Sequence, residues 1–291
     1  MNKNSIKRGY LNDNFRVFHL KDKIDMNIDF HHHDFNKIVV LLGGEITYYI
    51  EGKSYKLKPY DILLVAAHEV HKPQVTSTND YERMIFWVNS SFIKSIDSEL
   101  LLPFHTCINE GLHLLRLPDR NSDSLKKLLG EIIHEFKSND FGSNLFCSSL
   151  FLQFIVTINR MYRRRDFLEP SEVSYDKFIW SVIRYINENL DKELSIDALA
   201  SKFFISRYYL MHKFKVETGY TLYSYILEKK LSKSKDLLIE GKSIQDICTF
   251  LNFNDYSNFM RQFKKRFGKA PGAYKNDISN FSSMTSPTFK E

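Results

Sequence analysis

The first part of the chain, from about residue 15 to residue 115, alternates short apolar runs with turn residues. Ile38-Val39-Val40-Leu41-Leu42 ends at Gly43-Gly44, and Glu51-Gly52-Lys53 has the composition of a hairpin turn between two alternating segments. Short strands with turns at this spacing predict an antiparallel sandwich or barrel. The predicted strands cover residues 38–42, 46–50, 54–58, 62–65 and 81–88.

The period of the apolar pattern changes after Asn121, where apolar residues recur at helical spacing. A second helix is predicted from about Asn144 to Arg163, after the loop 140–143. An apolar helix pair beside a sheet either covers its core or forms a dimer surface, and the pattern leaves both open. The stripe of the first helix consists of Leu125, Leu128, Leu129, Ile132, Ile133 and Phe136.

The last third of the chain contains one small unit twice, about 48 residues apart, over 195–219 and 243–268. In each copy the pattern predicts a short helix, a turn and a longer helix, which is the arrangement of a helix-turn-helix whose second helix can enter a DNA major groove. Ser206 and Asp255 are placed to cap the longer helices. A long helix over 222–239 connects the two units.

Each of the longer helices has one apolar side and one polar side. Leu210 with Phe214, and Phe259 with Phe263, lie four residues apart and share an inward face. The opposite faces carry side chains that suit base edges and phosphates. The predicted DNA-contacting residues are Arg207, Tyr208, Met211, His212, Ser257, Asn258, Arg261 and Lys265.

The positive charge of the chain is concentrated in this repeated part. The net charge of the 291 residues is +6, and the segment 175–275 has 18 Lys and Arg against 11 Asp and Glu, whereas the rest has 23 against 24. A segment of net charge +7 in an otherwise neutral chain is what a polyanion-binding module requires. The 43% hydrophobic content excludes global disorder.

The cysteines and the N-terminus predict an intracellular, cytoplasmic protein. Cys107, Cys147 and Cys248 lack metal or redox spacing, and the last two fall on apolar helical faces, which fits a reducing compartment. Residues 1–23 are polar and charged, and no run approaches the roughly 20 apolar residues of a membrane span. No membrane partner is expected.

The segment 177–275 resembles the DNA-binding domain of the AraC/XylS family of bacterial transcription regulators. The resemblance implies that the DNA contacts fall at Arg207, Tyr208, Met211 and His212 and at Ser257, Asn258 and Arg261. The chain departs from the family pattern at Leu222, Lys230, Ser234, Cys248 and Asn252, none of which faces the groove. The matching residues are Ile196…Leu199-Ala200, Tyr209-Leu210…Phe214-Lys215…Gly219, Leu237-Leu238, Ser243-Ile244…Ile247, Phe253, Phe259…Arg261…Phe263-Lys264-Lys265…Gly268 and Pro271…Tyr274-Lys275.

A group of histidines marks the N-terminal part. His31 and His33 flank His32 at the start of the first strong strand, where side chains two apart share a face, and His71 closes a later strand. Three imidazoles from neighbouring strands either bind a metal or donate and accept hydrogen bonds to a ligand. The stretch 31–71 resembles the cupin barrel that serves as sensor domain in many AraC-type regulators. Asn36 and Lys37 stand where enzymatic cupins have a metal-binding Glu, which argues against catalysis.

These observations predict a regulator with a sensor, not an enzyme, with no cofactor or metal. The expected effector is a small polar molecule, of the carbohydrate class that the resembling family often binds, contacted by His31, His33 and His71, with Tyr48 or Trp87 stacking on it. The resemblance also implies transcriptional activation and contact with RNA polymerase. A repressor, a regulator controlled by a partner protein and a metal-dependent cupin enzyme with a helical appendage remain alternatives.

The expected fold class is a multidomain α+β protein with an N-terminal antiparallel cupin-like barrel, a helical pair, and an all-α double helix-turn-helix. The barrel is expected over residues 1–120, and the helical pair over 121–165 is expected to form a homodimer. A linker over 166–174, the double-stranded-DNA-binding domain over 175–275 and a flexible tail over 276–291 complete the chain.

Overall fold

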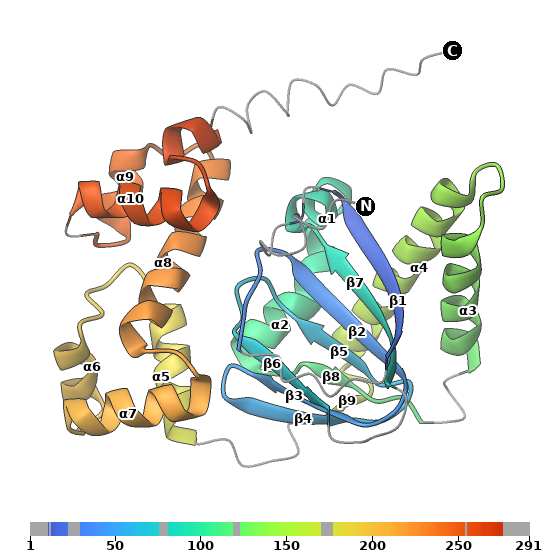
Figure 1. Cartoon of the computed structure of the whole chain (residues 1–291), viewed down its shortest axis with the longest axis horizontal. Helices are drawn as coiled ribbons and strands as arrows, with labels where there is room; N and C mark the ends of the chain where they lie inside the picture. Colours follow the sequence, from blue (N-terminus) through green and yellow to red (C-terminus); the bar gives the residue numbers. More distant parts are fainter. Residues whose placement is uncertain are drawn as a thin grey trace. The chain divides into compact units, whose positions relative to one another are not determined.

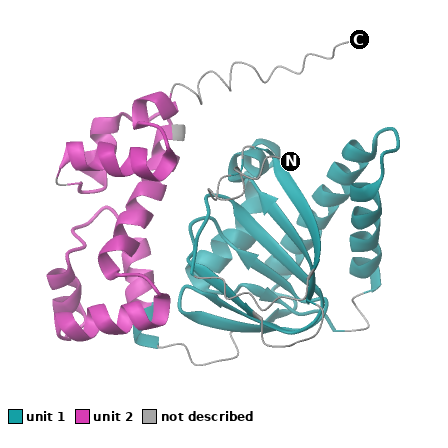
Figure 2. Cartoon of the chain, in the orientation of Figure 1, with its two compact units in different colours: residues 1–180 teal, residues 181–291 magenta. Residues whose placement is uncertain are grey.

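The computed structural model describes residues 11, 13–22, 30–75, 81–118, 123–169, 177–253 and 255–275. The chain divides into two compact units, residues 1–180 and 181–291 (Figure 2). The division falls inside helix α5, Lys177–Glu188. The predicted tail, 276–291, lies outside the described residues.

The first unit is built on two antiparallel sheets (Figure 1). The larger sheet has the strand order β1-β7-β2-β5-β8-β9, and the smaller has the order β4-β3-β6. The strands predicted over 46–50, 62–65 and 81–88 are confirmed with these bounds. The strands are β1 Phe15–Asp22, β2 Asn36–Gly43, β3 Ile46–Ile50, β4 Lys53–Leu57, β5 Ile62–Val65, β6 His71–Val75, β7 Tyr81–Val88, β8 Leu114–Leu115 and β9 Leu168–Glu169.

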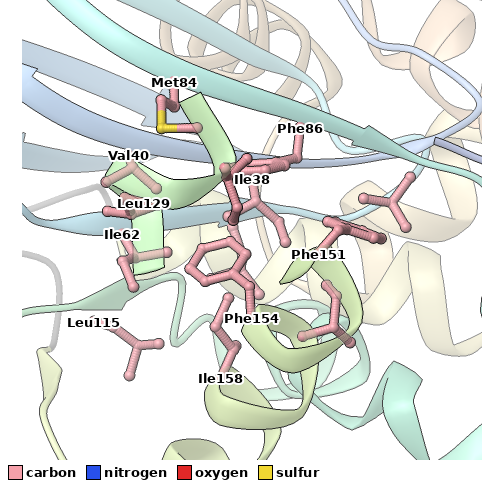
Figure 3. Close-up of a cluster of buried hydrophobic side chains, with 14 of the residues drawn as sticks. Ile38, Val40, Ile62, Met84, Phe86, Leu115, Leu129, Phe151, Phe154 and Ile158 are labelled. Carbon is pink, nitrogen blue, oxygen red and sulfur yellow. The ribbon is translucent and has the colours of Figure 1, made fainter. Parts of the chain in front are cut away.

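Strand β2 shows how the sequence divides the unit into two cores. Its even residues Ile38 and Val40 pack with the helices, while its odd residues Val39 and Leu41 pack between the two sheets. Residues two apart on a strand share a face, so Lys37 lies on the inner face with Val39. Figure 3 shows the helix-side core, in which Phe151 and Phe154 lie against Phe86.

The predicted barrel is not closed. Within the described residues, the larger sheet ends at β1 and β9, the smaller ends at β4 and β6, and no strand of one pairs with a strand of the other. The two sheets instead pack face to face through a shared apolar core that includes Val39, Tyr48 and Leu63. Alternating apolar residues specify which face is buried, and two packed sheets satisfy that pattern as well as a cylinder does.

Residues 90–110, which the sequence placed in the strand-like region, are helical. They form α1 Ser90–Ile96, a 3₁₀ turn η2 Ser98–Leu101 and α2 Leu102–Glu110. Asn89 caps α1 through a bond from the Ser91 amide, and Pro103 occupies the first turn of α2. These are ordinary signals of a helix start.

The helical pair predicted after residue 121 is confirmed as α3 Asp123–Lys137 and α4 Ser143–Arg164. Leu125, Leu128, Leu129 and Ile132 are buried, whereas Phe136 is exposed. Among the described helices, α4 alone is long and apolar enough to cross a membrane. Core helices meet the same criteria, and α4 buries Phe151, Phe154 and Ile158 against the sheet (Figure 3).

Strand β9 ties the start of the predicted linker 166–174 to the larger sheet. Leu114 pairs with Glu169 and Leu115 with Leu168. Arg165 adopts a left-handed conformation after α4 and forms a bidentate ion pair with Glu110. Residues 170–176 lie outside the described part of the chain.

The described secondary structure of the second unit consists of helices joined by short turns. Helix α8 has the bounds that the sequence predicts, and Ser206 and Asp255 cap α7 and α10 as predicted. Asn252 adopts φ 49°, the left-handed turn for which asparagine is a tolerated substitute for glycine. Beyond α5, the elements are α6 Ile196–Lys202, α7 Arg207–Thr218, α8 Leu222–Ile239, α9 Ile244–Phe250 and α10 Tyr256–Phe267.

Candidate DNA-binding surface and effector site

Helix α7 has a buried apolar side and an exposed polar side. Leu210 and Phe214 are fully buried, and Phe214 packs edge-on against Tyr225 of α8. The predicted groove residues Arg207, Tyr208, Met211 and His212 are all exposed. The Tyr208 and His212 rings stack at 6.0 Å, and Arg207 forms a 3.0 Å ion pair with Asp197 of α6. Helix α7 therefore presents cationic and aromatic groups to solvent.

Helix α10 repeats this division. Phe259, Phe263 and Phe267 are buried, and their rings follow one another along the helix. Ser257, Arg261 and Lys265 are exposed, and Asn258 is half-buried. The amide oxygen of Asn258 accepts bonds from Arg261 at 3.0 Å and from Gln262 at 3.4 Å. This network holds the Arg261 guanidinium beside the start of α10.

The structure thus places each set of predicted groove residues together on one helix face. A hollow of about 280 Å³ lies beside the α7 face. Its walls combine predicted groove residues with residues from the start of α8, and no pattern in the sequence indicated this hollow. The lining residues are Ile196, Tyr208, Met211, His212, Lys215, Thr221, Leu222 and Tyr223.

The structure brings the three predicted effector histidines together in the first unit. The His71 ring lies 4.3 Å from the His31 ring and 4.8 Å from the His33 ring. His31 and His71 form an antiparallel backbone bridge, and β2 begins only at Asn36, so the prediction that placed the histidines on that strand is wrong. The expected convergence of His31 and His33 is confirmed, although they lie in the segment before β2.

Tyr48 and Trp87 also lie on the inner faces of the two sheets, but they contact different residues. Tyr48 is 1% exposed, and the Nζ atom of Lys37 lies 5.7 Å from its ring centre. Trp87 is half-buried and pairs with Lys37 across the β2–β7 ladder. Its ring stacks on Phe35 at 4.5 Å. One face of the Trp87 indole is therefore already covered by protein.

Burial keeps His33 and His71 neutral. Burial lowers the pKa of both imidazoles well below 6.5, and the positive charge of Lys37 lowers each further. The Nδ1 atom of His33 lies 2.6 Å from the Phe35 carbonyl oxygen, and that of His71 lies 2.9 Å from the Glu69 carbonyl oxygen. The Nε2 atoms of both rings are buried without a hydrogen-bond partner in the described protein.

The sequence pattern assigned no role in this site to two buried basic side chains, Lys37, whose charge acts on His33 and His71, and Arg83, whose charge acts on Lys37. Burial and then the charge of Arg83 lower the pKa of Lys37 from 10.5 to about 8. Arg83 is itself buried, lies 4.0 Å over the Tyr81 ring and donates to the Tyr81 carbonyl. The available signal was position: Lys37 has the same strand parity as the inward residues Val39 and Leu41.

A second buried network, which the sequence did not indicate, is satisfied within the protein. The Glu69 carboxylate accepts from His113 Nε2 at 3.0 Å and from the Ala66 amide at 2.7 Å. The Tyr55 hydroxyl bridges His113 Nδ1 and the Gly111 carbonyl. These contacts give the network a structural role. In the described parts of the chain, no group of three or more His, Cys, Asp or Glu side chains is placed to hold a metal ion.

The comparisons with known proteins match both units. Residues 18–155 match the family described as AraC-like ligand binding domain, and residues 199–277 match the family described as helix-turn-helix domain. Together these matches define a DNA-binding regulator with an N-terminal ligand-binding domain. The chain belongs to the AraC family of transcription regulators.

Two curated relatives extend over most of the chain. It is 22% identical over 251 residues to the HTH-type transcriptional activator RhaR of Pectobacterium atrosepticum, covering 86% of this chain and 87% of that protein. It is 23% identical over 252 residues to RhaS of Shigella sonnei, covering 83% and 85%. A crystal structure of an apo single-residue variant of ToxT from Vibrio cholerae is 17% identical, with 91% and 98% covered and a TM-score of 0.39.

Proposed function

We propose that this chain is a homodimeric, sequence-specific activator that contacts two successive major-groove segments through α7 and α10, in response to a small polar effector held between the two sheets. The effector is of the carbohydrate class. The observation that carries the proposal is the repeated construction of α7 and α10, each with a side-chain N-cap, buried aromatic side and exposed polar side.

In this function, each of the pairs α6–α7 and α9–α10 forms a helix-turn-helix. Ser195 and Ser243 cap the first helices of the pairs through the amides of Ala198 and Asp246, so the two copies begin alike. Arg207, Tyr208, Met211 and His212 then contact one groove segment, and Ser257, Asn258, Arg261 and Lys265 the next.

The activator reading is favoured over a repressor because RhaR and RhaS are both described as activators. Activation in this family implies RNA polymerase as a further partner, and a cytoplasmic location follows from contact with DNA and polymerase. His31, His33 and His71 provide the polar contacts for the effector, and Tyr48 and Trp87 provide aromatic contacts. Neither catalysis nor a cofactor is part of the proposal.

The test is selection of binding sites from a random duplex library by the full-length protein, followed by fluorescence anisotropy. We expect an enriched site with two conserved blocks about one helical turn apart. Affinity for it should fall steeply with salt, because Lys and Arg displace counterions. A single enriched block, or no enrichment at low salt, contradicts the two-groove proposal.

A further inference from the structure

We infer that the effector is a polyhydroxylated carboxylate, a sugar acid, whose carboxylate pairs with Lys37 and whose hydroxyl groups donate to the Nε2 atoms of His33 and His71. The inference rests on the proposed function, because it names the effector class for the same site. It depends on the hydrogen-bonding state of two imidazoles and on a buried cation.

The tautomer of the two histidines follows from their partners. A carbonyl oxygen only accepts hydrogen bonds, so Nδ1 of His33 must donate to Phe35 and Nδ1 of His71 must donate to Glu69. In a neutral imidazole the other nitrogen then carries a lone pair. Both Nε2 atoms are buried acceptors without a partner among the described residues. They require donors, and ligand hydroxyl groups supply them.

Lys37, on the facing sheet, requires an anion, whereas the two imidazoles require hydrogen-bond donors. Its side chain is 7% exposed, and within the described parts of the chain no carboxylate forms an ion pair with it. Its ammonium group contacts the Tyr48 ring, and the nearby charged group is another cation, Arg83. A buried ammonium without an anion is costly, and a ligand carboxylate offsets that cost.

Lys37 and the two imidazoles lie close together between the sheets. Tyr48 and His71 belong to directly paired strands and share the inner face, because Ile50 pairs with His71 and Tyr48 is two residues before Ile50. Lys37 lies over Tyr48 from the larger sheet, and its charge acts on both His33 and His71. The positive charge of Lys37 would repel a metal ion. A hydroxy acid instead presents hydroxyl donors to the imidazoles and a carboxylate to the lysine.

The experiment uses full-length protein and two matched pairs of probes. D-galacturonate and D-galactose, and D-glucuronate and D-glucose, differ in having a carboxylate or a hydroxymethyl group at one carbon. We expect at least one uronate at about 10 mM to raise the Tm, and its neutral partner to raise it less. Lys37→Met should weaken uronate binding about 10- to 100-fold, as loss of a charged hydrogen bond does. Lys56→Met, at an exposed lysine on β4, is the control and should bind as the wild type does.

The same variant separates a ligand-binding lysine from a structural one. Without ligand, Lys37→Met should have a higher Tm than the wild type, because an apolar side chain of similar length replaces a buried cation. A lower Tm, unchanged uronate binding by the variant, equal gains from neutral sugars, or no gain from either uronate each overturn the inference. If a uronate binds but does not change the affinity for DNA, the proposed function is contradicted, while the assignment of the ligand as a sugar acid remains supported.

Discussion

At the scale of single residues, we expect the exposed face of α10 to separate base contacts from phosphate contacts. Arg261 is held by Asn258 at the start of the helix, whereas Lys265 lies one turn later and is exposed. A planar guanidinium fits the two acceptors of a guanine edge, while a lysine near the helix end neutralises phosphate.

Arg261→Ala should therefore cost about 1 to 3 kcal/mol of binding free energy on the selected site and relax specificity at one position. Lys265→Ala should weaken selected and random DNA alike. Anisotropy titrations on both duplexes measure the difference, with Arg184→Ala, an exposed arginine on α5, as the control. Equal losses on both duplexes for Arg261→Ala would show that Arg261 contacts only backbone.

Because of Lys37, we expect the free energy of unfolding of the first unit to rise as the pH increases from about 8 to 10.5. Its pKa is 10.5 when unfolded and about 8 when folded, and the groups facing it are His33, His71, Tyr48 and Arg83. Between these pH values the unfolded state binds more protons, so the cost of burying the ammonium disappears as the pH rises.

Lys37→Met should thus raise the free energy of unfolding near pH 7 by up to about 3 kcal/mol, and the gain should shrink to below about 1 kcal/mol near pH 10. Urea unfolding of wild type and variant at both pH values measures this, and titration of the other groups is common to both proteins. A gain of the same size at both pH values would mean that Lys37 is not buried as a cation.

Residue positions were predictable where a helical or strand period alone decides them. The exposed polar faces of α7 and α10 follow from the four-residue spacing of Leu210 and Phe214, and of Phe259 and Phe263, which are buried on the opposite side. His31 and His33 both approach His71, but they precede β2, so the strand period from which their convergence was predicted does not account for it. The tautomers of His33 and His71 could not be predicted, because they depend on carbonyl groups whose orientation is set by tertiary packing.

At the scale of elements, side-chain caps determine where the helices of the second unit begin. Ser206 Oγ accepts from the Tyr209 amide at 3.2 Å, which satisfies one of the amides left unpaired at the start of α7. Ser195, Thr221, Ser243 and Asp255 do the same for other helices.

Ser206→Ala should lower the free energy of unfolding by about 1 kcal/mol, because α7 loses its capping acceptor. Ser201→Ala, at an exposed position inside α6, should cause no loss, since alanine favours helix interiors. Urea unfolding followed by far-ultraviolet circular dichroism compares the two. Equal stability of Ser206→Ala and Ser201→Ala would contradict a capping role.

Elements with strong local signals were predicted to within a few residues, as α8 and β7 show. The helices over 90–110 were missed because each is too short for a helical period to stand out, although Asn89 and Pro103 were available signals. Closure of the sheets could not be predicted, since the alternation in β2, β3 and β5 fixes buried faces and does not fix which strand edges pair.

At the scale of the whole molecule, the α3–α4 hairpin leaves apolar side chains without a partner in the described chain. Phe136, Phe141, Leu145 and Phe146 have exposures of 47%, 109%, 77% and 54%. They cluster around the turn between the two helices, and Figure 1 shows this turn at the end of the hairpin. We expect such an exposed apolar patch to be a protein–protein interface.

We expect the full-length protein to be a homodimer that uses this patch, because symmetric dimers present paired binding surfaces to paired DNA sites. The double variant Leu145→Glu, Phe146→Glu should be monomeric in sedimentation velocity at about 10 µM, since two buried charges at each copy cost more than a patch of this size gains. Ile96→Glu, an exposed apolar residue on α1, should remain dimeric and serves as the control. A wild type that sediments as a monomer with and without effector contradicts the dimer. A double variant that stays dimeric places the interface elsewhere, and the apolar stripe of α3 and α4 then serves the core of the first unit alone.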